Sequence, residues 1–137
     1  MLTKPGFFPQ KLAAVVGSAM LLLTWVESSG AQVPLQTTQT VSLSPGGSTT
    51  IVLRENPSTG FRWQLNTAQS TRLSIVRVLD RGYQAARSGL IGASGSHGWE
   101  IKARAPGTAS VAFTYARPWE HKPPAEIHFV EVNIWRR

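Results

Sequence analysis

Short runs in which apolar and polar residues alternate are the feature that most limits what this chain can fold into. Beyond residue 31 such runs recur, as at Trp99, Ile101 and Ala103, and turn-forming Gly, Pro, Asn and Ser residues separate them. Alternation with a period of two buries one face of a strand, and no stretch of this part has the stripe of an amphipathic helix. The pattern predicts an all-β fold, a sandwich or barrel of about seven to eight strands.

The turn residues divide this part of the chain into short predicted strands. These are residues 40–43, 49–54, 61–65, 73–79, 99–104, 111–115 and 126–135. In the last of them Ile127 and Phe129 share one face, whereas Val130, Val132 and Ile134 fall on the other. Such a change of phase predicts a β-bulge near Phe129.

The first 31 residues have the pattern of an export signal and not of a folded domain. Two lysines precede an apolar run at residues 12–26, and small residues ending in Ala31 follow it. The run is short for a membrane span, which needs roughly 20 residues. We therefore expect a signal peptide over residues 1–31 and a periplasmic or secreted domain over residues 32–137. Retention of the run as a membrane anchor is the alternative.

The remaining 106 residues are a common size for one domain with its own core. They contain no cysteine, so disulfides, thiol nucleophiles and thiolate metal ligands are excluded. Twelve Lys and Arg residues against six Asp and Glu give a net charge of +6, but the arginines are scattered along the chain. Scattered charge is typical of a solvated surface, so we expect no nucleic-acid binding and no stable membrane insertion after signal cleavage. We also expect a monomer.

The polar residues do not form a recognisable catalytic or metal-binding motif. His97, His121 and His128 lack metal-ligand spacing and are interpreted as surface or loop residues. No two acidic residues have a spacing that suggests a general acid and base pair. A phosphate-binding glycine loop and a Gly-x-Ser-x-Gly nucleophile elbow are also missing from the sequence. We expect neither an enzyme nor a cofactor.

Three stretches, residues 56–60, 89–98 and 117–124, are not explained by strand periodicity. In the first, Asn56 favours a turn, Pro57 fixes its own φ and Gly60 permits a positive φ, which predicts a compact and stiff tip. In the third, Trp119 follows Pro118 at the exit of a strand and precedes residues that cannot enter a core. This position predicts an exposed aromatic anchor for binding. The alternatives are packing of Trp119 in the core and, for residues 56–60, an ordinary hairpin-like connection.

Three short motifs occur in these stretches. They read Asn-Pro-Ser-Thr-Gly-Phe at residues 56–61, Gly-Ala-Ser-Gly at residues 92–95 and Arg-Pro-Trp at residues 117–119. In order and spacing they resemble the signature loops of the chagasin family, Asn-Pro-Thr-Thr-Gly-Tyr/Phe, Gly-x-Gly-Gly and Arg-Pro-Trp/Phe. Ser58 and Ser94 depart from that pattern. The resemblance covers nearly all of the chain after residue 31.

The resemblance implies a reversible, tight-binding inhibitor of papain-like cysteine peptidases, built as an immunoglobulin-like β-sandwich with the three loops at one end. By the same resemblance residues 56–60 would enter the catalytic cleft of the peptidase, and the other two loops would flank them. The implied peptidase-binding residues are Asn56, Pro57, Ser58, Thr59, Gly60, Phe61, Gly92, Ala93, Ser94, Gly95, Arg117, Pro118 and Trp119. An exported carbohydrate- or surface-binding module, with Trp119 and Tyr83 as stacking platforms, is the alternative function.

Overall fold

The computed structural model describes residue 30 and residues 32–136. Apart from Gly30, the expected signal peptide therefore lies outside the described residues. Contacts within the chain divide it into two units, residues 1–30 and residues 31–137. The strands of the second unit are β1 (Leu35–Leu43), β2 (Ser48–Glu55), β3 (Arg62–Thr71), β4 (Val76–Gln84), β5 (Gly95–Ala103), β6 (Gly107–Ala116) and β7 (Glu126–Ile134). Two short 3-10 turns, Pro57–Thr59 and Leu73–Ile75, complete the described secondary structure.

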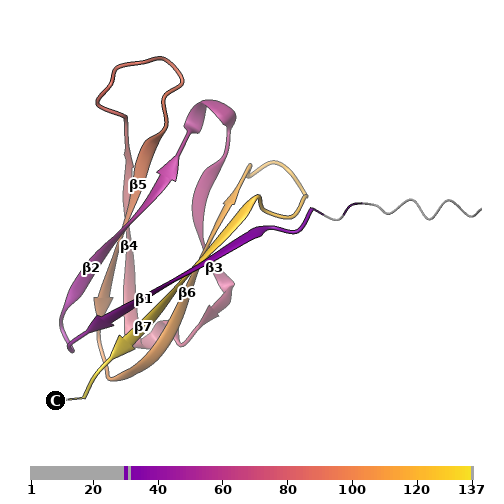
Figure 1. The fold of residues 1–137 in the computed structure, drawn as a ribbon. Helices are drawn as coiled ribbons and strands as arrows, with labels where there is room; N and C mark the ends of the chain where they lie inside the picture. The colour runs from indigo at the N-terminus through magenta and orange to yellow at the C-terminus, as the bar shows by residue number, and fades with distance from the viewer. Residues whose placement is uncertain (1–29, 31, 137) are drawn as a thin grey trace, which may run out of the picture. The chain divides into compact units, whose positions relative to one another are not determined.

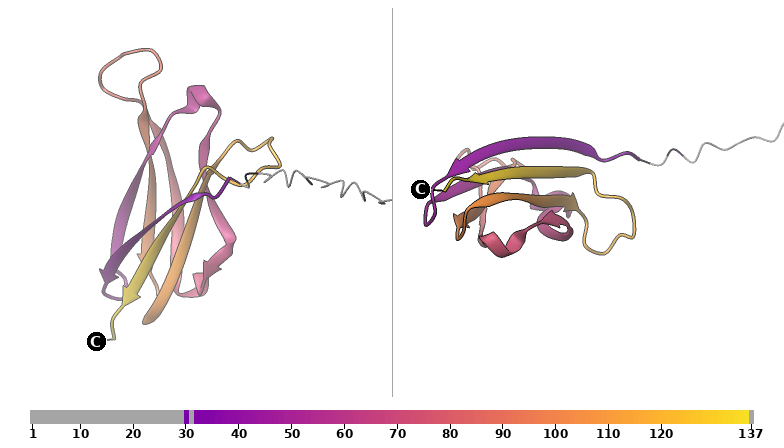
Figure 2. Two further views of the ribbon diagram at one scale, coloured as in Figure 1. Left: turned by 45° about the vertical axis from the view of Figure 1, so that its right-hand side comes forward. Right: turned by 90° about the horizontal axis from the view of Figure 1, so that it is seen from below.

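The seven strands form two layers (Figures 1 and 2). One sheet has the order β1-β7-β6-β3 and the other has the order β2-β5-β4. β1 runs parallel to β7, whereas all other neighbouring pairs are antiparallel. The predicted all-β sandwich is confirmed, with seven strands. Because β2 and β3 belong to different sheets, the loop between them crosses from one layer to the other.

The core lies between the sheets and comes from the alternating positions that the sequence predicts. In β5 the side chains of Trp99, Ile101 and Ala103 are buried, and the residues between them are partly exposed. The largest fully buried side chains are Phe113, Ile51, Ile101, Val111, Val130 and Val132. Each side chain of this kind stabilises the fold by about 1.5–3 kcal/mol through its removal from water. In a domain without disulfides this burial is the main source of stability.

The predicted bulge near Phe129 is wrong. β7 pairs with both β1 and β6 without a register shift. The change of phase arises because β7 is an internal strand with apolar residues on both faces: Val130 and Val132 enter the core, while Ile127 is buried on the opposite face. The register shifts lie elsewhere, in β3 between Asn66 and Thr71 and in β4 between Asp80 and Gly82.

Several strand boundaries differ from the predicted ones. The predicted fourth strand at residues 73–79 is a 3-10 turn followed by β4, which continues to Gln84 through pairing with β5. β1 begins at Leu35, five residues before its predicted start at Thr40, because its polar first half pairs with β7. β5 begins at Gly95, so the predicted loop at residues 89–98 ends at Ser94.

The interpretation of the histidines as surface or loop residues holds only for His121, which is exposed in a loop. His97 lies in β5 and is 8% exposed. His128 lies half-buried in β7, with its Nδ1 atom 2.6 Å from Thr37 Oγ1. Burial lowers the pKa of His128, and the nearby Glu126 carboxylate acts in the opposite direction.

Among the residues that the structure describes, none belongs to a helix long and apolar enough to cross a membrane.

Candidate functional site

Three loops lie at the end of the sandwich opposite the C-terminus (Figures 1 and 2). Loop 1 (residues 56–60, with Phe61 after it) joins β2 to β3, loop 2 (residues 85–94) joins β4 to β5, and loop 3 (residues 117–125) joins β6 to β7. They carry all the motif residues except Gly95, the first residue of β5, and Phe61. We call the three loops together the loop surface.

Loop 1 is stiffened by hydrogen bonds within it. Pro57–Thr59 form a 3-10 turn, with Asn56 as its N-cap and Gly60, at φ 81°, as its C-cap. The side-chain Oδ1 of Asn56 accepts hydrogen bonds from the Ser58 backbone N–H at 3.3 Å and from the Ser58 hydroxyl at 2.6 Å. The Thr59 hydroxyl donates to the Asn56 carbonyl at 2.7 Å. Both hydroxyl groups are therefore engaged inside the loop, and the exposed tip owes its shape to them.

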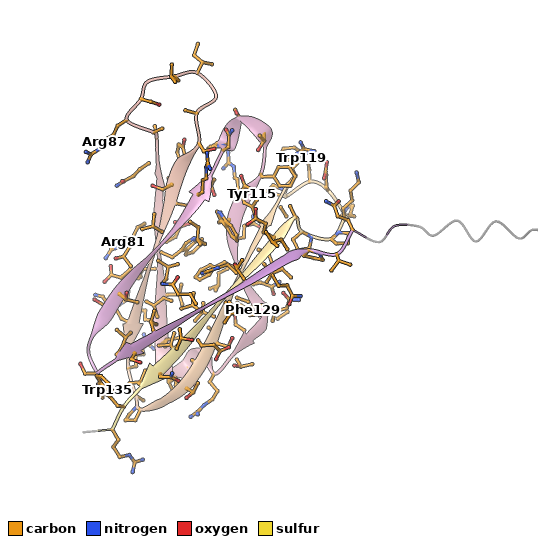
Figure 3. All side chains as sticks on the ribbon, in the orientation of Figure 1. Arg81, Arg87, Tyr115, Trp119, Phe129 and Trp135 are labelled. Atoms are coloured by element: carbon orange, nitrogen blue, oxygen red, sulfur yellow. The ribbon has the colours of Figure 1, made fainter. Side chains whose placement is uncertain are left out.

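Asn56 also joins loop 1 to loop 2 and to the strand beneath. Its side-chain Nδ2 donates to the Gly92 carbonyl at 3.1 Å, and its backbone N–H donates to the Tyr115 hydroxyl at 3.1 Å. The Tyr115 ring stacks on Trp63 with centroids 4.9 Å apart, and it also lies under loop 1 in Figure 3. The position of loop 1 is thus coupled, through the partly buried Tyr115, to the buried Trp63.

Arg117 joins loop 3 to loop 1. Its Nε donates to the Thr59 carbonyl at 2.9 Å, and its guanidinium lies over the Phe61 ring at 4.5 Å from the centroid. A further nitrogen, Nη1, donates to Glu120 Oε1 at 3.1 Å within loop 3. A planar guanidinium can make these contacts at once because its donors have a fixed geometry, which the ammonium of a lysine lacks.

Trp119 extends from loop 3 and packs against loop 1 (Figure 3). Its side chain is 66% exposed, as predicted from its position after Pro118. The far edge of the indole lies against Gly60, where a Cβ atom would overlap Trp119 Cη2. Gly60 therefore meets two requirements, since a positive φ and the close approach of the indole both favour glycine.

Position 94 does not require the glycine that the family pattern has there, so Ser94 is tolerated. The positive φ angles of loop 2 are those of Gly89 and Gly92, and Ser94 has none. Gly95 is different, because a Cβ there would overlap the Gln84 carbonyl and the Tyr83 hydroxyl. Of the motif's small residues, Gly95 is thus required by packing and Gly92 by its backbone conformation.

Two apolar residues of loop 2 belong to the loop surface and were not predicted from the sequence. Leu90 is 73% exposed and Ile91 is fully exposed. Adjacent bulky apolar residues in a Gly-rich, non-periodic stretch were the available signal. With Trp119 they give the loop surface apolar groups on both sides of loop 1, a feature typical of binding sites.

Within residues 30 and 32–136, no group of three or more His, Cys, Asp or Glu side chains is suited to hold a metal ion. The groups gathered at the loop surface are backbone amides, hydroxyls engaged in hydrogen bonds, apolar side chains, and polar or charged side chains that include the guanidinium groups of Arg87 and Arg117. A β-sandwich that presents three hydrogen-bonded loops of this kind belongs to the class of loop-mediated binding proteins.

Comparison with known proteins agrees with this class. Residues 42–134 match the family described as Chagasin family peptidase inhibitor I42. Chagasin from Trypanosoma cruzi is 35% identical over 82 residues, which cover 58% of this chain and 74% of chagasin. Amoebiasin-1 from Entamoeba histolytica is 23% identical over 95 residues, which cover 69% of this chain and 89% of the relative. The chain belongs to the chagasin family of cysteine peptidase inhibitors and is not an enzyme.

Solved structures share the fold. The cysteine protease inhibitor EhICP2 from Entamoeba histolytica superposes with a TM-score of 0.59 at 26% identity, covering 74% of this chain and 95% of that one. PbICP-C, solved in complex with falcipain-2, superposes with a TM-score of 0.60 at 23% identity, covering 76% of this chain and 92% of that one. The sandwich described above is thus the chagasin-like fold.

Replacing Gly60 by alanine should displace Trp119. A matched control is Gly46→Ala, because Gly46 has φ 82° and no atom within 4 Å of an added Cβ, whereas Gly60 has φ 81° and meets the indole. The left-handed backbone costs each variant about 1 kcal/mol of stability. Only Gly60→Ala should also shift the ¹⁹F resonance of a fluorotryptophan at position 119. Equal spectra for the two variants would contradict the packing of Trp119 on Gly60.

Proposed function

We propose that this protein inhibits papain-like cysteine peptidases reversibly, by placing loop 1 in the catalytic cleft with loops 2 and 3 on either side of it. The observation that carries the proposal is that the three family motifs lie on one surface, joined by the Asn56–Gly92 and Arg117–Thr59 hydrogen bonds. The residues proposed to contact the peptidase are those of the three motifs.

The internal hydrogen bonds of the loop surface favour tight binding. A flexible loop loses conformational entropy when it is ordered at an interface, at about 0.5–1.5 kcal/mol for each immobilised side chain. Ser58, Thr59 and Arg117 already have hydrogen-bond partners within the loop surface. Less entropy then remains to be lost on association, and more of the interaction energy appears as affinity.

The same hydrogen bonds explain why the peptidase would not cleave loop 1. A peptidase needs a carbonyl that is free to enter its oxyanion site while the thiolate attacks. The Asn56 carbonyl accepts from Thr59, the Pro57 carbonyl from the Gly60 N–H, and the Thr59 carbonyl from Arg117. The 3-10 turn also differs from the extended backbone of a substrate. Loop 1 would therefore fill the cleft while its turn and these hydrogen bonds keep the Asn56, Pro57 and Thr59 carbonyls out of attack geometry.

Apolar groups would supply most of the remaining affinity. Trp119 on loop 3 and the Leu90 and Ile91 pair on loop 2 are the exposed large apolar residues of the loop surface. Exposed aromatic residues at the centre of an interface commonly dominate its binding energy. Trp119 is held in position by Gly60, so we propose it as the strongest single contributor.

A titration tests the proposed function. The purified protein is added to papain at increasing concentrations while hydrolysis of a small fluorogenic peptide is followed. We expect stoichiometric, reversible loss of hydrolysis and recovery of intact inhibitor by mass spectrometry. Unchanged hydrolysis with an excess of folded protein, or inhibitor cut within loop 1, would disprove the proposal.

Trp119→Ala should weaken the inhibition of papain by about 2 kcal/mol or more, the loss typical of a strong interface anchor, which is about thirtyfold in the inhibition constant. Trp135→Ala is the matched control, because Trp135 is 60% exposed and lies at the opposite end of the sandwich (Figure 3). Its inhibition constant should equal that of the unchanged protein. An equal effect of the two substitutions would remove Trp119 from the binding mechanism.

We also propose that the protein acts outside the cytoplasm, in the periplasm or as a secreted protein, after removal of residues 1–31. The apolar run at residues 12–26 and the small residues that follow it support this proposal. Intact-mass measurement of protein recovered from the exported fraction should give a chain that begins near Gln32. A mass that includes residues 1–31, in a membrane fraction, would instead support a retained anchor.

A further inference from the structure

Loop 1 begins and ends on different sheets, which leaves its base without the support that a hairpin has. β2 ends at Glu55 in the three-stranded sheet, and β3 begins at Arg62 in the four-stranded sheet. In a hairpin, ladder hydrogen bonds fix the distance between the two strands that carry the loop. Since β2 and β3 are not paired with each other, some other contact has to fix the separation of the two ends of loop 1.

Glu55 and Trp63 supply that contact. Glu55 Oε2 accepts a hydrogen bond from the Trp63 backbone N–H at 2.7 Å, and Trp63 Nε1 donates to the Arg54 carbonyl at 2.8 Å. Both bonds run from the end of β2 to the start of β3. They join the two sheets directly below loop 1, where Glu55 is 3% exposed.

His97 and Asp80 hold the Glu55 carboxylate in place. His97 Nδ1 lies 3.2 Å from both carboxylate oxygens of Glu55, and its Nε2 lies 2.6 Å from Asp80 Oδ1. The imidazole also stacks on Trp99, with ring centroids 4.9 Å apart. His97 is the third residue of β5, directly after loop 2, so its contact with Glu55 joins the bases of loops 1 and 2, and Asp80 lies on the neighbouring strand β4. We call Glu55, His97 and Asp80 the charged network.

Burial of a carboxylate adds little net free energy to the stability of a core. Its desolvation costs several kcal/mol unless good hydrogen bonds compensate, and apolar residues of similar volume often do as well or better. Buried polar groups do, however, specify one geometry, because each donor and acceptor has to meet its partner. Glu55 makes its bonds across the sheet-to-sheet gap under loop 1, where a unique geometry matters for a surface that has to fit a cleft.

We propose that the charged network is a positioning device for the loop surface: through Trp63, Glu55 sets the separation of the two ends of loop 1, and His97 and Asp80 fix the orientation of Glu55. None of these three residues needs to touch the peptidase. The inference rests on the proposed function for its effect on inhibition, but its structural part stands independently of any peptidase.

The experiment compares four variants of the purified protein. Glu55→Leu keeps the volume and removes the acceptor, whereas Glu55→Gln keeps an acceptor for the Trp63 N–H. His97→Phe keeps the ring packed on Trp99 and removes both nitrogens. Val132→Ala is the control for stability, because Val132 is a fully buried core residue of β7 outside the network and the loops. Inhibition of papain and amide hydrogen exchange are measured at a temperature where every variant is folded by circular dichroism.

Glu55→Leu should speed hydrogen exchange at the Trp63 and Gly60 amides and raise the inhibition constant about tenfold or more, because the loop is no longer preorganised. His97→Phe should have a smaller effect of the same kind, and Glu55→Gln should restore most of the inhibition. Val132→Ala should lower the melting temperature and leave the inhibition constant unchanged. A merely structural role of Glu55 would make the loss of inhibition follow the loss of stability in all four variants.

Two further results would also overturn the inference. One is unchanged exchange at these amides in folded Glu55→Leu, or in folded His97→Phe if Glu55→Leu does not fold. The other is faster exchange together with full inhibition. If the unchanged protein does not inhibit papain, the proposed function fails, and the exchange measurements alone decide whether the charged network positions loop 1.

Discussion

The crossing of loop 1 between the two sheets is the constraint on which the loop surface depends. β2 and β3 share no ladder, so backbone pairing does not fix this connection, whereas it does fix the β4–β5 and β6–β7 connections that carry loops 2 and 3. Side-chain hydrogen bonds fix the β2–β3 connection instead, both below the loop and above it. Glu55 joins the strand ends below the loop, while Asn56 and Arg117 join the loop to its neighbours above. Three segments that are remote in sequence thereby become one surface, supported by a core that contains no disulfide.

The contacts of loop 1 also determine what the surface can do. The hydroxyls and most carbonyls of loop 1 are engaged within the protein, which leaves steric shape as its main means of recognition, while loops 2 and 3 add exposed apolar residues and charged side chains such as Arg87 and Lys122. A surface of this kind is suited to occupy a preformed cleft and poorly suited to catalysis, since no reactive group is presented. Membership of the peptidase inhibitor family agrees with this physical description.

Local patterns predicted the fold well where burial follows alternation. Trp99 and Ile101 lie in the core as their spacing predicts, and the turn residues of loop 1 form the predicted stiff tip. The prediction failed where residues remote in sequence determine the secondary structure or the burial of a segment. The polar start of β1 is a strand because β7 lies beside it, and β7 has no bulge because it is buried on both faces. His97 was misinterpreted for the same reason, since Glu55 and Asp80 are 42 and 17 residues away in sequence.

The motif residues differ in how strictly the structure requires them. Gly60 is required by its left-handed backbone and by the indole of Trp119, and Gly95 by the overlap of any Cβ with β4. Ser94 has no positive φ, so a serine fits there although the family pattern has glycine. Ser58 replaces a threonine and keeps the hydroxyl that bonds to Asn56. Both departures thus fall at positions where the contact or the backbone conformation tolerates the change. At Ser58 and Ser94 this chain differs from the family pattern, but it keeps the hydrogen bond to Asn56 and the backbone conformation of loop 2.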